Sequence, residues 1–144
     1  MKLLVAVDLS PVSAHVVQAA QQVAAAMDAE VVVMHCAAPE PEFVGYEAGP
    51  EGVRDHVAAQ IWQEHSAVQE IAAQLRAAGL DATGLLVRGP TVETTLREAE
   101  RLGVDLVVVG SHGRGAVSKL LVGSYSEGIL RNSPVPVVVV PTRT

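Results

Sequence analysis

Cysteine, aromatic side chains and basic residues are all scarce in this sequence. Its one cysteine, Cys36, excludes an intramolecular disulfide framework and a zinc site built from several cysteines. Ten Lys and Arg stand against 16 Asp and Glu, which gives a net charge of −6 at pH 7. Because proteins that hold nucleic acid through its phosphates are normally basic, we expect no nucleic-acid partner.

Long hydrophobic runs are also missing. No apolar stretch approaches the roughly 20 residues that a membrane-spanning helix needs, so we expect no membrane insertion. The N-terminal segment reaches Asp8 without the apolar length or the small-residue cleavage site of a signal peptide. A cytoplasmic protein is therefore the simplest expectation. With 144 residues, 49% of them apolar and 18% charged, the chain has the size and composition of one globular domain, residues 1–144.

Short runs rich in valine recur along this domain and lack an alternation of polar and apolar residues. Strands buried on both faces have this pattern, which is typical of a parallel sheet. The predicted strands are Leu3–Val7, Val31–Met34, Leu85–Val87, Leu106–Val109 and Val135–Val140.

Apolar residues spaced three and four apart predict a helix between each pair of strands. We expect the first helix to begin with Ser10 as its N-cap, and the second and third to end at Gly79 and Gly103. The fourth is predicted within residues 121–130. Right-handed crossovers then give a doubly wound α/β fold with helices on both faces of the sheet. Residues 37–52, rich in Pro, Gly and Glu, are predicted to form a long surface loop.

The stretch from Gly110 to Ser124 follows a predicted buried strand and leads into a helix. Ligands of open α/β sheets bind at the carboxyl ends of the strands, and glycines there let main-chain N–H groups approach anionic oxygens. The N-terminus of the next helix and the charges of Arg114 and Lys119 favour the same kind of ligand. The stretch therefore predicts a phosphate site, with a ligand-free glycine-rich turn as the alternative. It is not a Walker loop, because no Gly-Lys-Ser/Thr follows the glycines.

The spacing Gly110-x2-Gly113-x9-Gly123-Ser124 resembles the ATP-binding signature of the universal stress protein family. The similarity extends over essentially the whole chain. Its other segments are Asp8-Leu9-Ser10, Val31–Cys36, Arg88-Gly89-Pro90 and Val135–Val140.

This resemblance implies a five-stranded parallel sheet in the order 3-2-1-4-5, with ATP lying across the tips of strands one and four. It also implies that Mg2+ or Mn2+ is carried by the phosphates and not by a protein cage. The residues it assigns to ATP are Val7, Asp8 and Cys36 beside adenosine, Gly110, His112 and Gly113 around the ribose and phosphates with Val109 and Arg114 beside them, and Gly123, Ser124 and Ser126 at the phosphate tail.

Several of these residues also have simpler explanations. Asp8 is a candidate cap of the first helix; in the site it should face sugar or base, because a carboxylate repels polyphosphate. His112 and Arg114 are equally interpretable as solvated loop residues. His35 is more often a satisfied core histidine than a ligand, and Cys36 has no basic neighbour in the sequence that would make its thiol reactive.

Catalytic motifs are few. The sequence contains no His-Glu-x-x-His, no Gly-x-Ser-x-Gly and no evident Ser-His-Asp set. We therefore expect no enzyme, with slow ATP hydrolysis or self-phosphorylation at most, and interpret the chain as an ATP-binding signalling module of the stress response. One alternative is a stress protein that acts through protein contacts without ATP. The other is an adenylyl-transferring enzyme of a related fold, whose motifs after the first strand are absent here.

The last predicted strand, Val135–Val140, is a long apolar edge that invites pairing. In the family, two copies join these strands antiparallel, and the resemblance implies the same homodimer. Pro136 lacks an N–H, so it should start the strand or face away from the ladder. No feature of the sequence identifies a protein partner.

Overall fold

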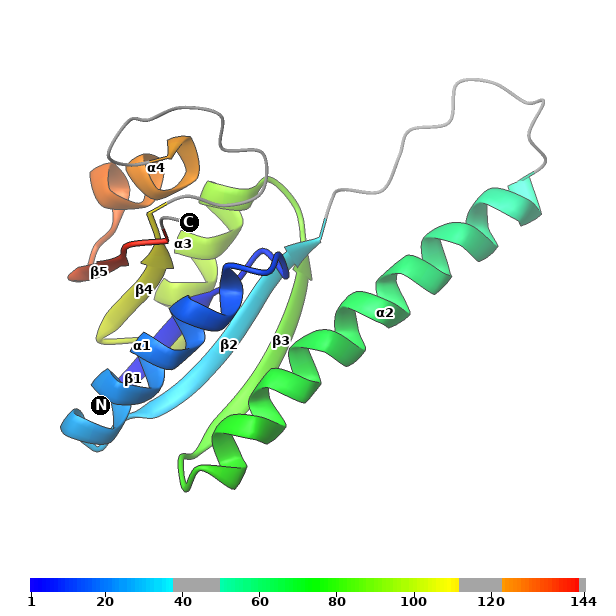
Figure 1. The fold of residues 1–144 in the computed structure, drawn as a ribbon. Coiled ribbons are helices and arrows are strands. Elements are labelled where there is room, and N and C mark those ends of the chain that lie inside the picture. The colour runs from blue at the N-terminus through cyan, green and yellow to red at the C-terminus, as the bar shows by residue number, and fades with distance from the viewer. Residues whose placement is uncertain (38–49, 112–122, 143–144) are drawn as a thin grey trace.

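A computed structural model describes residues 1–37, 50–111 and 123–142 (Figure 1). The strands are β1 (Lys2–Ala6), β2 (Glu30–Ala37), β3 (Ala82–Arg88), β4 (Leu106–Gly110) and β5 (Val137–Val140). The helices are α1 (Ser13–Met27), α2 (Pro50–Ala77), α3 (Thr91–Leu102) and α4 (Ser124–Asn132). All strand pairs are parallel and their order is β3-β2-β1-β4-β5, which confirms the predicted fold class and strand order.

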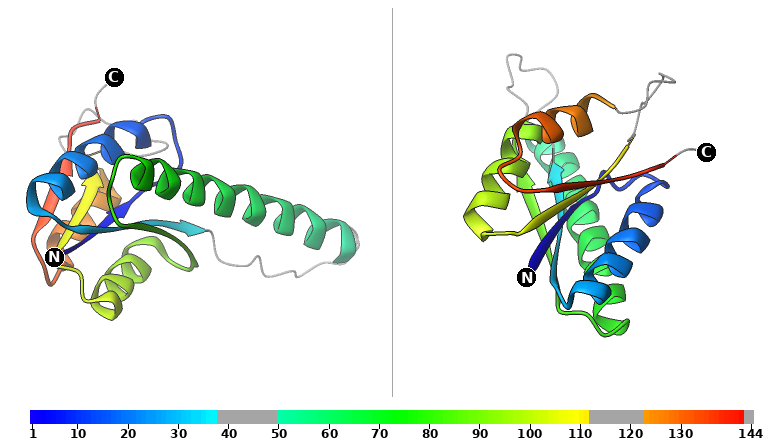
Figure 2. Two further views of the ribbon diagram at one scale, coloured as in Figure 1. Left: turned by 90° about the horizontal axis from the view of Figure 1, so that it is seen from below. Right: turned by 90° about the vertical axis from the view of Figure 1, so that its left-hand side faces the viewer.

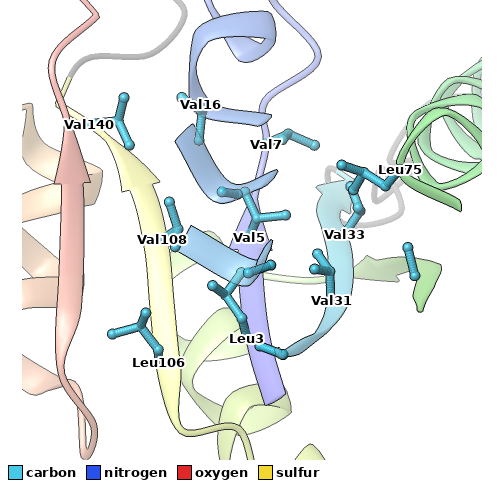
Figure 3. Packing of buried hydrophobic residues seen from close by; sticks show 14 of the residues in the cluster. Leu3, Val5, Val7, Val16, Val31, Val33, Leu75, Leu106, Val108 and Val140 are labelled. Carbon is cyan, nitrogen blue, oxygen red and sulfur yellow. The ribbon is translucent and has the colours of Figure 1, made fainter. Parts of the chain in front are cut away.

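Buried strand residues alternate between two apolar layers. Leu3 and Val5 of β1 pack with α1 and α2, and Figure 3 shows this layer together with Val16 of α1. Leu4 and Ala6 pack on the other face, in the layer to which α3 and α4 contribute. Figure 2 shows the two helix pairs on opposite sides of the sheet. Because both faces are covered, consecutive strand residues must all be apolar, which explains the valine-rich runs.

The structure corrects several predicted boundaries. β2 and β3 are longer than predicted, because their ladder continues through polar residues from Val31 opposite Ala82 to Ala37 opposite Arg88. α2 begins at Pro50, so both ends of the predicted 37–52 loop are wrong, and the remainder of that loop lies outside the described residues.

Some helix ends are predicted correctly and others are not. α1 begins at Ser13, and its N-cap position is occupied by Val12 without a side-chain bond, so the prediction of Ser10 as N-cap is wrong. α4 runs from Ser124 to Asn132 with Gly123 as its N-cap, so it ends later than the predicted range of 121–130, of which residues 121–122 lie outside the described residues. The predicted helix-ending glycines are confirmed, since Gly79 and Gly103 have φ values of +94° and +65°.

α2 is the longest helix of the described residues, with 28 residues, and its N-terminal end extends well beyond the sheet (Figures 1 and 2). Trp62 lies on this helix with 68% of its surface exposed. Among the described helices, none combines the length and the hydropathy needed to cross a bilayer.

Gly89 makes the turn that leads from β3 to α3. Its N–H donates to the carbonyl of Ala37 (3.2 Å), its φ is +145°, and a Cβ built on it would lie 2.5 Å from Thr94 Oγ1. We expect Gly89→Ala to lower the free energy of unfolding by about 3 kcal/mol, because backbone strain and a collision add. Gly79→Ala is the control, since φ is +94° there but nothing lies within 4 Å of a Cβ. We expect it to cost about 1 kcal/mol in urea unfolding, and equal losses would contradict the steric argument.

Candidate functional site

The carboxyl ends of β1 and β4 lie side by side at the centre of the sheet. Strand order reverses at this point, because the chain continues from β1 to β2 and β3 on one side and reaches β4 and β5 on the other. Parallel α/β sheets bind their ligands at such a reversal. The polar groups around it come from the ends of β1, β2 and β4 and from the first turns of α3 and α4.

Asp8 holds the turn that follows β1. Its Oδ1 accepts hydrogen bonds from the Ser10 N–H (2.9 Å), the Ser10 hydroxyl (2.6 Å) and the Ser13 hydroxyl (2.9 Å). Leu9, between them, has a φ of +62°, a left-handed conformation that costs energy for a residue with a Cβ. Asp8 therefore ties the tip of β1 to the first residue of α1, although it is not the N-cap of that helix. Such supported strain is typical of functional sites.

His35 of β2 fixes the main chain at the end of β1. The Val7 N–H donates to the carbonyl of Met34 (2.9 Å), and His35 Nδ1 lies 2.8 Å from the Val7 carbonyl. Because a carbonyl only accepts, Nδ1 carries the proton. His35 Nε2 lies 3.8 Å from a carboxylate oxygen of Glu64 in α2. The interpretation of His35 as a satisfied core histidine is thus confirmed, whereas the contact of Val7 with adenosine stays a prediction.

Main-chain groups of β2 alternate in direction, and this fixes where those of Cys36 face. The Met34 carbonyl accepts from Val7 on the β1 side, and the Ala37 carbonyl accepts from Gly89 on the β3 side. Residues two apart in a strand direct their main-chain groups to the same side. The N–H and C=O of Cys36 therefore face the β1 side, two residues past the point where the β1–β2 register ends at Met34. They offer a neighbouring donor and acceptor at the strand tips.

The side chain of Cys36 points away from this edge, into the layer between the sheet and α3. Its Sγ lies 3.8 Å from both the Thr91 carbonyl and Thr95 Oγ1. Burial, the largest cause, raises the pKa of the Cys36 thiol above its ordinary value. A thiol that stays protonated is a poor nucleophile, so the alternative of a reactive cysteine is disfavoured.

The N-terminus of α4 is fastened to the tip of β4. The Gly123 N–H donates to the Ser111 carbonyl (2.6 Å), and the buried Ser126 hydroxyl donates to the Gly110 carbonyl. The first main-chain bond of the helix runs from the Glu127 N–H to the Gly123 carbonyl (2.9 Å), and the N-cap residue, Gly123, offers no side-chain bond to this end. The amides of residues 124–126 precede that bond, so this end of α4 carries the partial positive charge that favours an anion.

The predicted phosphate residues thus occupy different places. Ser124 is exposed at the start of α4, as a phosphate contact requires. The Ser126 hydroxyl instead donates a hydrogen bond to the Gly110 carbonyl and faces inward. The side chain of Val109 is fully buried in the second apolar layer. Roles of Val109 and Ser126 at the ligand stay predictions. His112, Gly113, Arg114 and Lys119 lie outside the described residues.

Sequence reasoning missed Thr95 and Tyr125. Thr95 is fully buried in α3, and its Oγ1 lies 2.8 Å from the hydroxyl of Tyr125, the second residue of α4. A signal was present, because Thr95 falls on the same predicted helix face as Val92 and Leu96. A polar residue on a core face needs a partner, and an aromatic residue directly after Gly123-Ser124 was a candidate for it.

In the part of the chain that the structure describes, no three His, Cys, Asp or Glu side chains come together as a metal-binding group. That Mg2+ or Mn2+ is carried by nucleotide phosphates stays a prediction.

Comparison with known proteins gives one consistent family. Residues 1–141 match the profile of the universal stress protein family. The universal stress protein YxiE of Bacillus subtilis (strain 168) is 29% identical over 144 residues, which cover 96% of this chain and 97% of the relative. The universal stress protein UspA from Lactobacillus plantarum has a similar structure, with a TM-score of 0.82, 18% identity and 97% of each chain covered.

Two further solved structures contain adenine nucleotides. A universal stress protein in complex with cAMP has a TM-score of 0.69 and 24% identity, and the match covers 99% of this chain and 98% of that one. The universal stress protein from Archaeoglobus fulgidus in complex with dAMP has a TM-score of 0.66 and 17% identity, with 97% of each chain covered. At these identities the likeness establishes a shared fold.

Proposed function

Since the chain belongs to the universal stress protein family, we propose that it is a binding module for an adenine nucleotide, with ATP as the principal ligand. One observation carries the proposal: the main-chain N–H and C=O of Cys36 and the N-terminus of α4 lie around the same strand-order reversal. One end of the site therefore offers a donor–acceptor pair and the other an anion site.

The chemistry of an adenine nucleotide fits both ends. Adenine presents an exocyclic N–H donor beside a ring-nitrogen acceptor, the complement of the Cys36 main chain. Phosphate oxygens fit the amides that precede the first internal bond of α4. We assign Asp8, at the tip of β1, to the sugar between them. The ligands in the two structural neighbours, cAMP and dAMP, share adenine and phosphate, which supports an adenine nucleotide as the class.

We propose binding without efficient catalysis. His35 is the histidine nearest the strand tips among the described residues, and its ring bonds to the Val7 carbonyl and faces Glu64. Its Nδ1–H is therefore engaged in holding β1 and its Nε2 faces Glu64, so we do not assign it as a general base. A nucleotide-dependent change at a dimer surface is the mode of action we favour, with the free edge of β5 as that surface.

Thermal unfolding tests nucleotide binding. ATP with Mg2+ at about 100 times its dissociation constant should stabilise the protein by about 2.7 kcal/mol and raise its Tm by about 5–10 °C. GTP is the control, because guanine reverses the donor and acceptor that would meet Cys36. Gly113→Val should remove the ATP shift while the Tm without nucleotide stays unchanged, since glycine spacing in residues 110–124 predicts a close approach to phosphate.

A flat response to millimolar ATP would contradict nucleotide binding and favour the second function, protein contacts alone. An ATP–pyrophosphate exchange signal would instead support the adenylyl-transfer alternative.

A further inference from the structure

A buried polar chain links the ends of β2, α3 and α4. Thr95 Oγ1 donates to the Thr91 carbonyl (2.7 Å) and lies 2.8 Å from the Tyr125 hydroxyl. A threonine hydroxyl has one proton, and here the Thr91 carbonyl takes it, so the Tyr125 hydroxyl is the donor to Thr95. Cys36 Sγ, at 3.8 Å, is a further neighbour of Thr95 Oγ1.

This chain has a fixed direction. Tyr125 is partly buried, and burial, the largest cause, raises the pKa of its phenol, so Tyr125 stays a donor across the physiological pH range. Thr95 has no exposed surface. Successive hydroxyls that donate in one direction strengthen each other, and water cannot replace the bond at a fully buried atom.

The main chain of Tyr125 lies at the phosphate end of the proposed nucleotide site, and its side chain reaches toward the base end. Its main-chain N–H is one of the amides that precede the first internal bond of α4. Its hydroxyl lies beside Thr95, whose Oγ1 is 3.8 Å from Cys36 Sγ. One side chain thus spans from the phosphate end to the residues predicted for adenosine.

We propose that Tyr125 and Thr95 are positioning residues: their buried hydrogen bond sets the spacing between the Cys36 main chain, which reads the base, and the α4 amides, which hold phosphate. The inference rests on the proposed function. A ligand that occupies both ends needs that spacing, whereas adenosine, without phosphate, needs the base end alone. Breaking the bond therefore weakens nucleotide binding selectively.

The test compares dissociation constants for ATP with Mg2+, by calorimetry, and for adenosine, by competition. Tyr125→Phe and Thr95→Val each remove one hydroxyl with little change of shape. We expect each to weaken ATP binding roughly five- to tenfold and to leave adenosine binding unchanged. The double variant should lose no more than either single one, because both remove the same bond.

Two controls separate positioning from general loosening. Thr95→Ser keeps the hydroxyl and should retain the wild-type ratio of ATP to adenosine affinity. Thr83→Val removes an exposed hydroxyl near the N-terminal end of β3, away from the carboxyl ends of the strands where the site lies. It should also leave the ratio of ATP to adenosine affinity unchanged. A purely structural role would lower the Tm without moving this ratio.

The outcomes are distinct. An unchanged ratio in Tyr125→Phe and Thr95→Val, or equal weakening of ATP and adenosine, would overturn the positioning role while wild-type ATP binding still upholds the proposed function. Wild-type protein that binds neither ligand would overturn the proposed function and, with it, this inference.

Discussion

Asp8→Ala is expected to lower the free energy of unfolding by about 2–4 kcal/mol and to reduce nucleotide affinity at least tenfold. Three donors, the Ser10 N–H and the hydroxyls of Ser10 and Ser13, share Oδ1 and would lose it together. The left-handed turn at Leu9, with φ of +62°, would lose its support. Urea unfolding measures the first effect and calorimetry with ATP the second.

Asp8→Asn separates the two roles of this carboxylate. An amide oxygen in the same position still accepts from Ser10 and Ser13, so most of the stability should be retained. The charge is lost, and with it the stronger acceptor for a ribose hydroxyl. We expect the loss in free energy of unfolding to be less than half as large in Asp8→Asn as in Asp8→Ala. ATP binding should still be weakened in Asp8→Asn. Wild-type affinity in both variants would remove Asp8 from the nucleotide site.

The described architecture was largely predictable because it depends on burial. Leu3 to Ala6 must be apolar on both faces, since helices cover both sides of β1, and this leaves an unmistakable run in the sequence. Strand order was implied by the family resemblance, whereas the right-handed crossover rule gave only helices on both faces of the sheet. Thr83 and Gly84 belong to β3 through main-chain pairing with β2, and their residue types do not indicate a strand. The predicted strand was therefore too short.

Side-chain partners at the site were less predictable. Ser10 and Pro11 have the pattern of a helix start, yet the Ser10 hydroxyl donates to Asp8 and the helix begins three residues later. A local hydrogen bond between Ser10 and Asp8 competes with capping of the helix by Ser10. The sequence alone does not show which of these two arrangements is more stable. The bond between Thr95 and Tyr125 joins residues 30 positions apart, so only the packing of α3 on α4 reveals it.

The second prediction with a large expected effect concerns the outer edge of β5, the last strand of the described sheet. At the start of this strand the Pro136 carbonyl accepts from the Val107 N–H, and at its end the Val140 carbonyl accepts from the Ser111 N–H, both on the β4 side. Pro136 precedes the strand, as expected for a residue without an N–H. Main-chain groups alternate, so those of Val139 face outward, where a second copy would pair.

Val139→Pro should therefore convert a dimer into a monomer in sedimentation velocity, because it removes an outward N–H and places a ring on the edge while the ladder with β4 remains. Val138→Pro is the matched control: its N–H faces β4, so it should unfold the protein instead. Val138→Asp, the choice that an edge strand suggests from sequence, is less decisive, since Val138 packs against the first apolar layer and a carboxylate there also destabilises the fold. If the wild-type protein sediments as the expected dimer and a folded Val139→Pro protein does the same, the interface lies away from β5.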